Sequence, residues 1–241
     1  MFNFIRNLII FFLQKTRDYT IGIFRDFNFF NKSPFERYQE ESLKNSYDHF
    51  KKYFAQAIFL KNFKIKNYAI SKALENKESG IYLEFGVHKG DSINFFSNLI
   101  GDEKIYGFDS FEGLKEDWKG TQATKGTFDL KGKIPKLNKN VTPIKGWIQD
   151  TLPKFIEKAE KINFVHMDVD TYETTKFVLK KIKPFLNSGA IILFDELYNN
   201  IGWEENEYKA LIEIFDENEY KYLAFSKEGA QVLIKYNKLT S

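Results

Sequence analysis

Acidic side chains end two apolar segments of this 241-residue chain, where they could bind a cation. The first segment ends in Asp168-Val169-Asp170, and the second is followed by Asp195-Glu196. Both have the composition of buried strands, and neighbouring parallel strands lie about 4.8 Å apart, so the carboxylates are expected to converge. Three converging carboxylates repel one another unless protons or a cation intervene. Oxygen ligands without cysteine suit Mg²⁺ or Mn²⁺, so the sequence predicts a divalent-metal site.

A glycine-containing turn follows an earlier apolar segment, residues 81–85, in the sequence EFGVHKGDS. Gly86 lets the chain turn sharply after a strand, and Gly90 lets the next helix start close to a ligand whose anionic group meets free backbone N–H groups. Asp109 ends the following apolar segment, 23 residues after Gly86, where a carboxylate can accept hydrogen bonds from both hydroxyls of a ribose. These features predict a site for an adenosine-containing cofactor, but residue types alone do not separate NAD from S-adenosylmethionine.

These motifs depend on strands whose carboxyl ends bring them to one edge of a sheet. Strands are expected at residues 81–85, 104–108, 141–145, 162–168 and 190–194, with a terminal hairpin at 220–225 and 231–236. Helices are expected at 91–99, 150–160, 170–185 and 204–216, with Asp150 and Asp170 as caps. The alternation predicts an α/β, Rossmann-like fold with a mostly parallel seven-stranded sheet and an antiparallel edge strand.

The chain is expected to divide into an N-terminal helical extension, residues 1–76, and a cofactor-binding domain, residues 77–241. Ser33 before Pro34 marks a helix start in the extension, and residues 44–76 are expected to form one or two helices. Residues 112–140 are polar and rich in Lys, Gly and Thr, which predicts a long loop or lid. Loops of that length are often functional.

The first 14 residues are strongly apolar but too short to span a bilayer, which needs about 20 residues. Apolar side chains at positions 2, 5, 9 and 12 fall near one helical face, and basic residues stand at 6, 15 and 17. One hypothesis is a helix in the membrane interface, giving a peripheral membrane contact. The other is a helix packed on the protein itself or on a second subunit, as in a homodimer.

Composition excludes several classes of site. The chain has 36 basic and 33 acidic residues, a net charge of +3 that gives no case for nucleic-acid binding. It has no cysteine, which excludes disulfides, thiolate metal sites and a cysteine nucleophile. The absence of cysteine suits a cytoplasmic protein.

Five segments resemble, in order, the macrocin-type O-methyltransferase family within the class I methyltransferases. They are YLEFGVHKGDS, KIYGFDSFEGL, KGWIQDTLP, FVHMDVDTYETT and AIILFDEL, which lie within about residues 80–200. The resemblance implies S-adenosylmethionine as cofactor. It also implies a small-molecule hydroxyl acceptor, a sugar or glycan precursor.

The resemblance implies which residues bind the cofactor and the metal. Glu84 and Gly86 would lie along the methionine part, Ser92 near its carboxylate, Asp109 on the ribose and Ser110 on the adenine side. The remaining implied cofactor contacts are Val87, His88 and Gly90 in the turn, and Gly146, Trp147 and Asp150 near the adenine. Core packing is the alternative for Trp147, and helix capping for Asp150. The implied metal ligands are Asp168, Asp195 and Glu196, although the family often has Asp where this chain has Glu196.

This set of residues suits methyl transfer to oxygen, because the acceptor hydroxyl must lose its proton. A divalent cation can orient the oxygen and lower its pKa, and a nearby carboxylate or histidine can take the proton. The candidate catalytic residues are Asp168 and His166, with a core histidine as the alternative for His166. Trp203 could stack on a sugar ring or be half buried at a helix start.

Rival functions account for fewer of these residues. A metal-dependent glycosyltransferase would use Asp168-Val169-Asp170 to bind a sugar-nucleotide diphosphate, but it leaves Gly86 and Asp109 unexplained. An NAD-dependent oxidoreductase would use the turn and Asp109 but does not need the acidic cluster. A non-enzymatic protein on the same scaffold would need neither an intact cofactor motif nor an intact acidic cluster.

Overall fold

The computed structural model describes residues 2–118, 121–158 and 160–238. Contacts divide the chain into two compact units, Met1–Glu41 and Ser42–Ser241. The first unit contains helix α1 (Phe2–Asn31) and the first turns of α2 (Pro34–Phe54). As predicted, α2 begins at Pro34, and Ser33 and Glu36 form a reciprocal cap in which each side chain accepts a hydrogen bond from the other's backbone N–H. The domain boundary expected at residue 76 stays a prediction.

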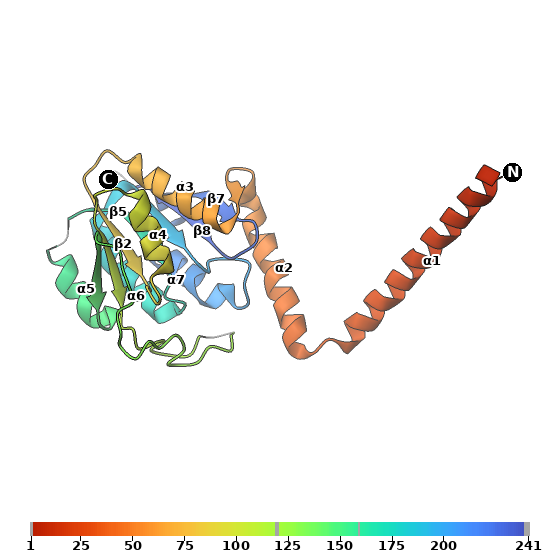
Figure 1. Cartoon of the computed structure of the whole chain (residues 1–241), viewed down its shortest axis with the longest axis horizontal. Helices are drawn as coiled ribbons and strands as arrows, with labels where there is room; N and C mark the ends of the chain where they lie inside the picture. The colour runs from red at the N-terminus through yellow and green to blue at the C-terminus, as the bar shows by residue number, and fades with distance from the viewer. Residues whose placement is uncertain (1, 119–120, 159, 239–241) are drawn as a thin grey trace. The chain divides into compact units, whose positions relative to one another are not determined.

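An eight-stranded sheet forms the centre of the second unit, in the order β1-β7-β8-β6-β5-β2-β3-β4 (Figure 1). All neighbouring strands are parallel except β6–β8 and β7–β8. The prediction of a mostly parallel, Rossmann-like sheet is confirmed, but the sheet has eight strands and not the expected seven. The strands are β1 (Ile58–Leu60), β2 (Ile81–Phe85), β3 (Ile105–Asp109), β4 (Val141–Lys145), β5 (Ile162–Met167), β6 (Leu186–Phe194), β7 (Tyr220–Ser226) and β8 (Val232–Tyr236).

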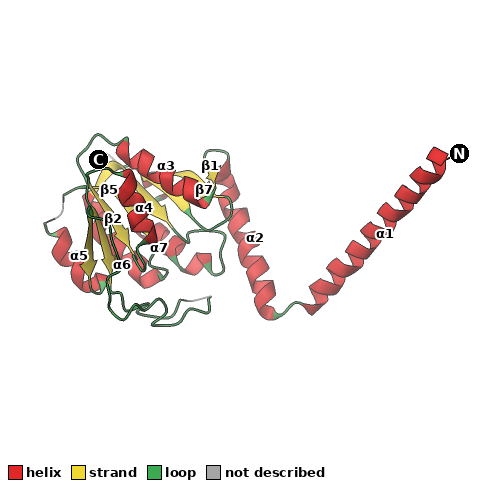
Figure 2. Ribbon diagram, in the orientation of Figure 1, coloured by secondary structure: helices red, strands yellow, loops and turns green. Residues whose placement is uncertain are grey.

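Helices cover both faces of this sheet (Figure 2). Helices α3 (Asn62–Leu74) and α4 (Asp91–Leu99) bury one face, and α5 (Ile148–Ile156), α6 (Tyr172–Ile182) and α7 (Glu207–Ile214) bury the other. Side chains of β2 alternate between these layers: Tyr82 packs with α3 and α4, whereas Leu83 and Phe85 pack with α5 and α6. Short 3₁₀ helices lie at Lys183–Phe185, Trp203–Glu205 and Glu217–Glu219.

Strand β1 lies where only helices were expected, so the prediction for residues 44–76 is partly wrong. Its three residues pair in parallel with β7, with Ile58 opposite Ala224, and Ile58 and Phe59 are exposed. A three-residue edge strand without an inward-facing apolar alternation leaves no periodic signal. Because β1 and β7 both lie beyond β8, the antiparallel strand β8 is inside the sheet and not at its edge.

Two helices start away from their expected caps. Helix α5 begins after Trp147, so Asp150 lies exposed in the first turn instead of capping it. Helix α6 begins after Thr171, and Asp170 precedes it with φ +62°, a left-handed backbone conformation. The predictions of Asp150 and Asp170 as caps are therefore wrong.

The strand order brings the candidate site residues to one edge. Strand β2 lies between β3 and β5, so Glu84 is opposite Gly107 on one side and His166 on the other. Strand β6 is the next neighbour of β5, and the Asp195 N–H donates to the Met167 carbonyl just past the ends of both strands (3.0 Å). The segments that follow β2, β3, β5 and β6 therefore emerge together.

Candidate functional site

A cavity of about 380 Å³ opens at the carboxyl ends of β2, β3, β5 and β6. Its wall combines the glycine turn, the end of β3, the start of α5 and the acidic segments after β5 and β6. Of the predicted site residues, those that line it are Gly86, Val87, His88, Ser92, Asp109, Ser110, Trp147, Asp168 and Glu196. The predicted residues that do not line it are Glu84, Gly90, Gly146, Asp150, His166 and Asp195.

The glycine turn needs its glycines for local steric reasons. Gly86 has φ +88°, and a Cβ there would lie 1.7 Å from the Asp168 carbonyl oxygen. No side chain fits at that distance, so the turn after β2 lies directly against the segment after β5. Gly90 has φ +84° and stands at the N-cap position of α4, which starts the helix at the cavity wall.

Asp109 holds the turn together from the next strand. Its Oδ2 accepts hydrogen bonds from the N–H groups of Val87 (2.8 Å) and His88 (2.7 Å), and its Oδ1 accepts one from Phe111 (2.6 Å). A carboxylate offers about four acceptor positions, so about one remains for a ligand. Asp109 therefore has a structural role that the sequence analysis missed, and it has room for one ribose hydroxyl instead of two.

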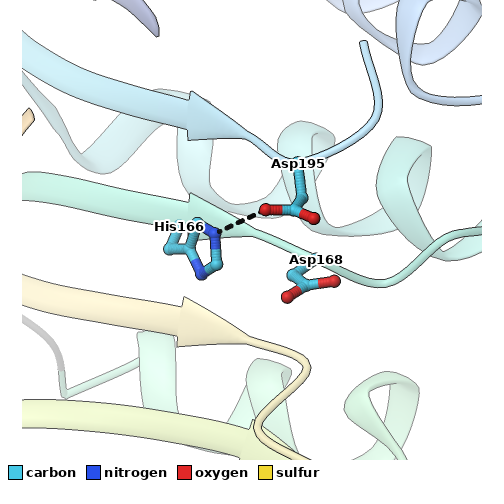
Figure 3. Close-up of side chains that lie close together, drawn as sticks. All are labelled: His166, Asp168 and Asp195. Carbon is cyan, nitrogen blue, oxygen red and sulfur yellow. Dashed lines mark ion pairs between the residues drawn. The ribbon is translucent and has the colours of Figure 1, made fainter. Parts of the chain in front are cut away.

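A buried row of polar side chains runs behind the cavity wall. The Ser92 hydroxyl donates to Glu84 Oε1 (2.7 Å), and Glu84 Oε2 lies 3.4 Å from His166 Nδ1. On the other side of the ring, His166 Nε2 lies 3.5 Å from Asp195 Oδ1 (Figure 3). Glu84 and His166 have no exposed surface, which favours the core-histidine alternative over His166 as a proton acceptor. The row links the cofactor turn to the acidic cluster.

The acidic cluster lies at the end of this row. Two sets of potential ligand atoms lie within 4.8 Å of one another among the described residues: His166, Asp168 and Asp195, and Asp168, Asp170 and Glu196. Asp168 belongs to both sets, whereas Asp195 and Glu196 belong to one each. In Figure 3 the Asp168 and Asp195 carboxylates emerge side by side from neighbouring strands, next to the His166 ring.

Burial and mutual repulsion shift the pKa values of these groups. Burial, followed by the neighbouring Asp195 charge, raises the pKa of Asp168 and of Glu196 well above their usual values and that of Asp170 to about 7. Burial alone would lower the pKa of His166, but Asp195 and Glu84 outweigh it and raise it to about 10. Burial would raise the pKa of Asp195, yet His166 holds it below its usual value.

This donor set fits a hard divalent cation. Apart from a His166 nitrogen, the potential ligand atoms are carboxylate oxygens, and Glu196 Oε2 is buried with no hydrogen-bond partner in the described part of the chain. Buried oxygens without partners are costly, and a cation would satisfy them. A cation would also remove the repulsion that holds the Asp168 and Glu196 pKa values high.

The outer wall comes from the predicted loop. Gly113, Leu114, Lys115, Trp118 and Phe128 line the cavity. Reciprocal backbone hydrogen bonds tie this loop to itself, from the Leu114 N–H to the Thr127 carbonyl and from the Gly126 N–H to the Leu114 carbonyl, both 2.9 Å. The Phe128 ring packs edge-on against His88 with centroids 5.4 Å apart. The loop therefore contacts the glycine turn through Phe128.

The structure resolves two open alternatives for tryptophans. Trp147 is half buried and lines the cavity, with Lys115 Nζ 5.6 Å from its ring centroid, so it is not a core residue. Trp203 is 2% exposed and packs with His49, Phe50 and Tyr208. Sugar stacking on Trp203 is therefore wrong, because the indole is part of the core and does not line the cavity.

Known proteins resemble this chain in sequence. Residues 83–197 match a family model described as a methyltransferase domain. A 4′-O-methyltransferase of a rhamnosyl tetracenomycin from Streptomyces olivaceus is 25% identical over 162 residues, which are 57% of this chain and 60% of the relative. Residues 83–197 therefore resemble a methyltransferase domain, and this match covers just under half of the chain. The matched segment spans only about three-fifths of the length of this curated relative.

Solved structures share the fold of this chain. The calicheamicin methyltransferase CalS11 aligns with a TM-score of 0.60 and 21% identity, over 86% of this chain and 95% of its own. The O-methyltransferase NovP aligns with a TM-score of 0.53 and 18% identity, over 73% of this chain and 79% of its own. At these identities the likeness establishes the fold alone.

Proposed function

We propose that this protein transfers the methyl group of S-adenosylmethionine to a hydroxyl of a small molecule, a sugar or glycan precursor. The observation that carries the proposal is one cavity lined by both the glycine turn and the acidic cluster. The turn suits an adenosine cofactor, and the cluster suits activation of a hydroxyl. The Streptomyces olivaceus relative is named for methylation of a rhamnosyl group, which supports a sugar acceptor.

The proposed cofactor lies along β2 and β3. Gly86 lines the cavity, and the Ser92 hydroxyl stands at the start of α4, where free N–H groups favour an anionic carboxylate. Asp109 has about one acceptor position left for a ribose hydroxyl, and Ser110 and Trp147 flank the adenine end. Leu114, Trp118 and Phe128 of the loop line the cavity and would shield the reacting groups from water.

Asp168, Asp195 and Glu196 are the residues proposed to hold Mg²⁺ or Mn²⁺. Such an ion, when bound, supplies positive charge that lowers the pKa of the acceptor hydroxyl. Asp168 lines the cavity and is the group proposed to take the hydroxyl proton. His166 is proposed as a positioning residue, because it is buried between Glu84 and Asp195 and cannot reach an acceptor.

Calorimetric titration with S-adenosylhomocysteine, with and without Mg²⁺, tests the cofactor class. We expect binding in the micromolar range, and methyl transfer to a panel of sugar hydroxyls that excess chelator suppresses. Absence of binding under both conditions would refute the methyltransferase proposal.

A metal-dependent glycosyltransferase is the second candidate, because Asp168 and Asp170 of the Asp-Val-Asp sequence both line the cavity. Its ligand would be a nucleoside diphosphate held through a cation. Titration with uridine and guanosine diphosphates in the presence of Mg²⁺ separates the two functions. Tight binding of either nucleotide together with no binding of S-adenosylhomocysteine would favour the glycosyltransferase.

The exposed apolar face of α1 suits a partner outside its own unit. Ile5, Ile9 and Phe12 are 50%, 53% and 70% exposed, and basic side chains flank them. In the described part of the chain, no helix is long and apolar enough to cross a membrane. We infer a peripheral membrane contact, with a homodimer as the alternative. Flotation with anionic vesicles distinguishes them, since a homodimer would stay in the lipid-free fraction and elute at twice the monomer mass.

A further inference from the structure

Lys66 lines the cavity but lies outside the segment that matches the methyltransferase domain. It comes from α3, whose buried side chains Ile65, Ala69 and Ile70 fix the helix against the sheet. Lys66 follows Ile65 directly and precedes Ala69 by three positions, so it lies at the edge of that buried face. Packing of α3 therefore holds the lysine at the cavity.

The Lys66 ammonium forms no ion pair in direct contact within the described part of the chain. Its Nζ lies 6.0 Å from the Phe96 ring centroid, and among the described residues it has no hydrogen-bond or ion-pair partner. Burial would raise the pKa of Asp195, but His166 lowers it. The Lys66 charge contributes to this lowering from a distance. A half-buried cation without a counter-ion has lost part of its hydration and suits an anionic ligand group.

The neighbours of Lys66 indicate at which end of the cavity it lies. Phe96, whose ring centroid lies 6.0 Å from its ammonium, is four residues, about one helical turn, after Ser92 on α4. The other lysines of the wall differ: Lys89 is exposed, and Lys115 lies against Trp147 at the proposed adenine end. Lys66 is therefore the half-buried cation on the Ser92 side of the cavity, within the described residues.

We propose that Lys66 binds the α-carboxylate in the methionyl part of S-adenosylmethionine, across from Ser92. This inference rests on the proposed function, because it assigns one end of that cofactor. The carboxylate is the anionic group of the molecule, and Asp109 and Trp147 assign the ribose and adenine to the opposite end of the cavity. An anionic group of the acceptor, such as a phosphate, has the same chemistry and is the competing source.

A pair of ligands that differ in this carboxylate tests the assignment. S-adenosylhomocysteine carries the amino-acid carboxylate, and 5′-methylthioadenosine keeps the adenosine and the thioether but lacks it. Both are titrated by calorimetry into the full chain, into Lys66→Gln, and into the matched control Lys64→Gln, an exposed lysine on the same helix. Thermal unfolding establishes that each variant is folded.

We expect Lys66→Gln to weaken S-adenosylhomocysteine binding about 10- to 100-fold, the range for loss of one charge-assisted hydrogen bond. Binding of 5′-methylthioadenosine should change less than about twofold, because the lost interaction is absent from that complex. Lys64→Gln should leave both affinities unchanged, and Lys66→Arg should restore part of the lost affinity because it keeps the charge.

Three results would overturn the assignment. If Lys66→Gln bound both ligands more weakly by the same factor, Lys66 would only maintain the shape of the cavity wall. If Lys66→Gln bound S-adenosylhomocysteine as before but bound inorganic phosphate or pyrophosphate more weakly, Lys66 would bind an anionic group of the acceptor instead. Absence of S-adenosylhomocysteine binding to the unaltered protein would refute the proposed function itself, which distinguishes that failure from a failure at Lys66.

Discussion

Replacement of Asp109 should weaken the fold before any ligand is added. Three backbone N–H groups donate to its carboxylate, at 2.8, 2.7 and 2.6 Å. A hydrogen bond to a charged group contributes about 1.5–3 kcal/mol when buried, and Asp109 is half buried, so water can replace part of each. We therefore expect Asp109→Ala to lower the free energy of unfolding by about 3–5 kcal/mol. That is a large share of the ~5–15 kcal/mol typical of a domain.

Asp109→Asn should lower the free energy of unfolding by a smaller amount. Its single carboxamide oxygen can still accept from the Val87 and His88 N–H groups, whereas its NH₂ group would face the Phe111 N–H. We expect a loss of about 1–3 kcal/mol, smaller than that of the alanine variant. Urea unfolding of the three proteins without ligand measures the order. If both variants unfold at the same urea concentration as the parent, Asp109 does not hold the turn and the reasoning fails.

Because Asp109 also holds the turn, its ribose contact needs a test that leaves the side chain intact. Loss of cofactor binding in Asp109→Ala could result from a disordered turn instead of a lost ribose contact. Changing the ligand avoids this problem. With about one acceptor position left on Asp109, S-adenosylhomocysteine analogues lacking the 2′- or the 3′-hydroxyl should differ in affinity. Equal losses for the two analogues would contradict a single contact.

Three further perturbations test the turn and the acidic cluster. Gly86→Ala should cost clearly more stability in urea unfolding than Gly101→Ala, because both have positive φ but only Gly86 has an atom within 4 Å of the added Cβ; equal costs would contradict this. Glu196→Gln should weaken Mg²⁺ binding at least about tenfold in calorimetry while S-adenosylhomocysteine binding stays within about twofold, and a reversed pattern would place Glu196 at the cofactor. The pKa of Asp170, raised from 3.8 to about 7, means that its protonated form stabilises the fold below about pH 4 and that this contribution is lost as pH rises through 7. The gain in melting temperature on adding Mg²⁺ should therefore be larger at pH 8 than at pH 6, and a gain independent of pH would contradict the cluster as its site.

Local signals explain what the sequence predicted well. The strand at residues 81–85 and the helix at 91–99 agree with β2 and α4, because a buried apolar run and a glycine turn act within a few residues. Strand β1 was missed because three residues at a sheet edge carry no periodicity. The cap predictions for Asp150 and Asp170 failed because side-chain type alone does not fix which residue begins a helix.

Contacts between distant segments explain what the sequence could not predict. Trp203 has polar neighbours in sequence, but its ring packs against Phe50, more than 150 residues earlier. Lys66 lies in a segment without a chemical motif, and only the packing of α3 brings it to the cavity. Asp109 was assigned to a ligand, whereas the structure gives most of its acceptor capacity to the chain's own backbone.

The amount of negative charge behind the cavity gives the strongest argument for a cation. Glu84 and Asp195 flank His166, whose pKa is raised to about 10, so one positive ring faces two carboxylates. Asp168 and Glu196 then have no positive partner in direct contact among the described residues, and their pKa values are raised well above normal. A site that keeps these carboxyls protonated could not use Asp168 as a proton acceptor near neutral pH. A divalent cation would offset their charge and make these residues usable, so the case for a metal rests on the whole arrangement and not on any single ligand.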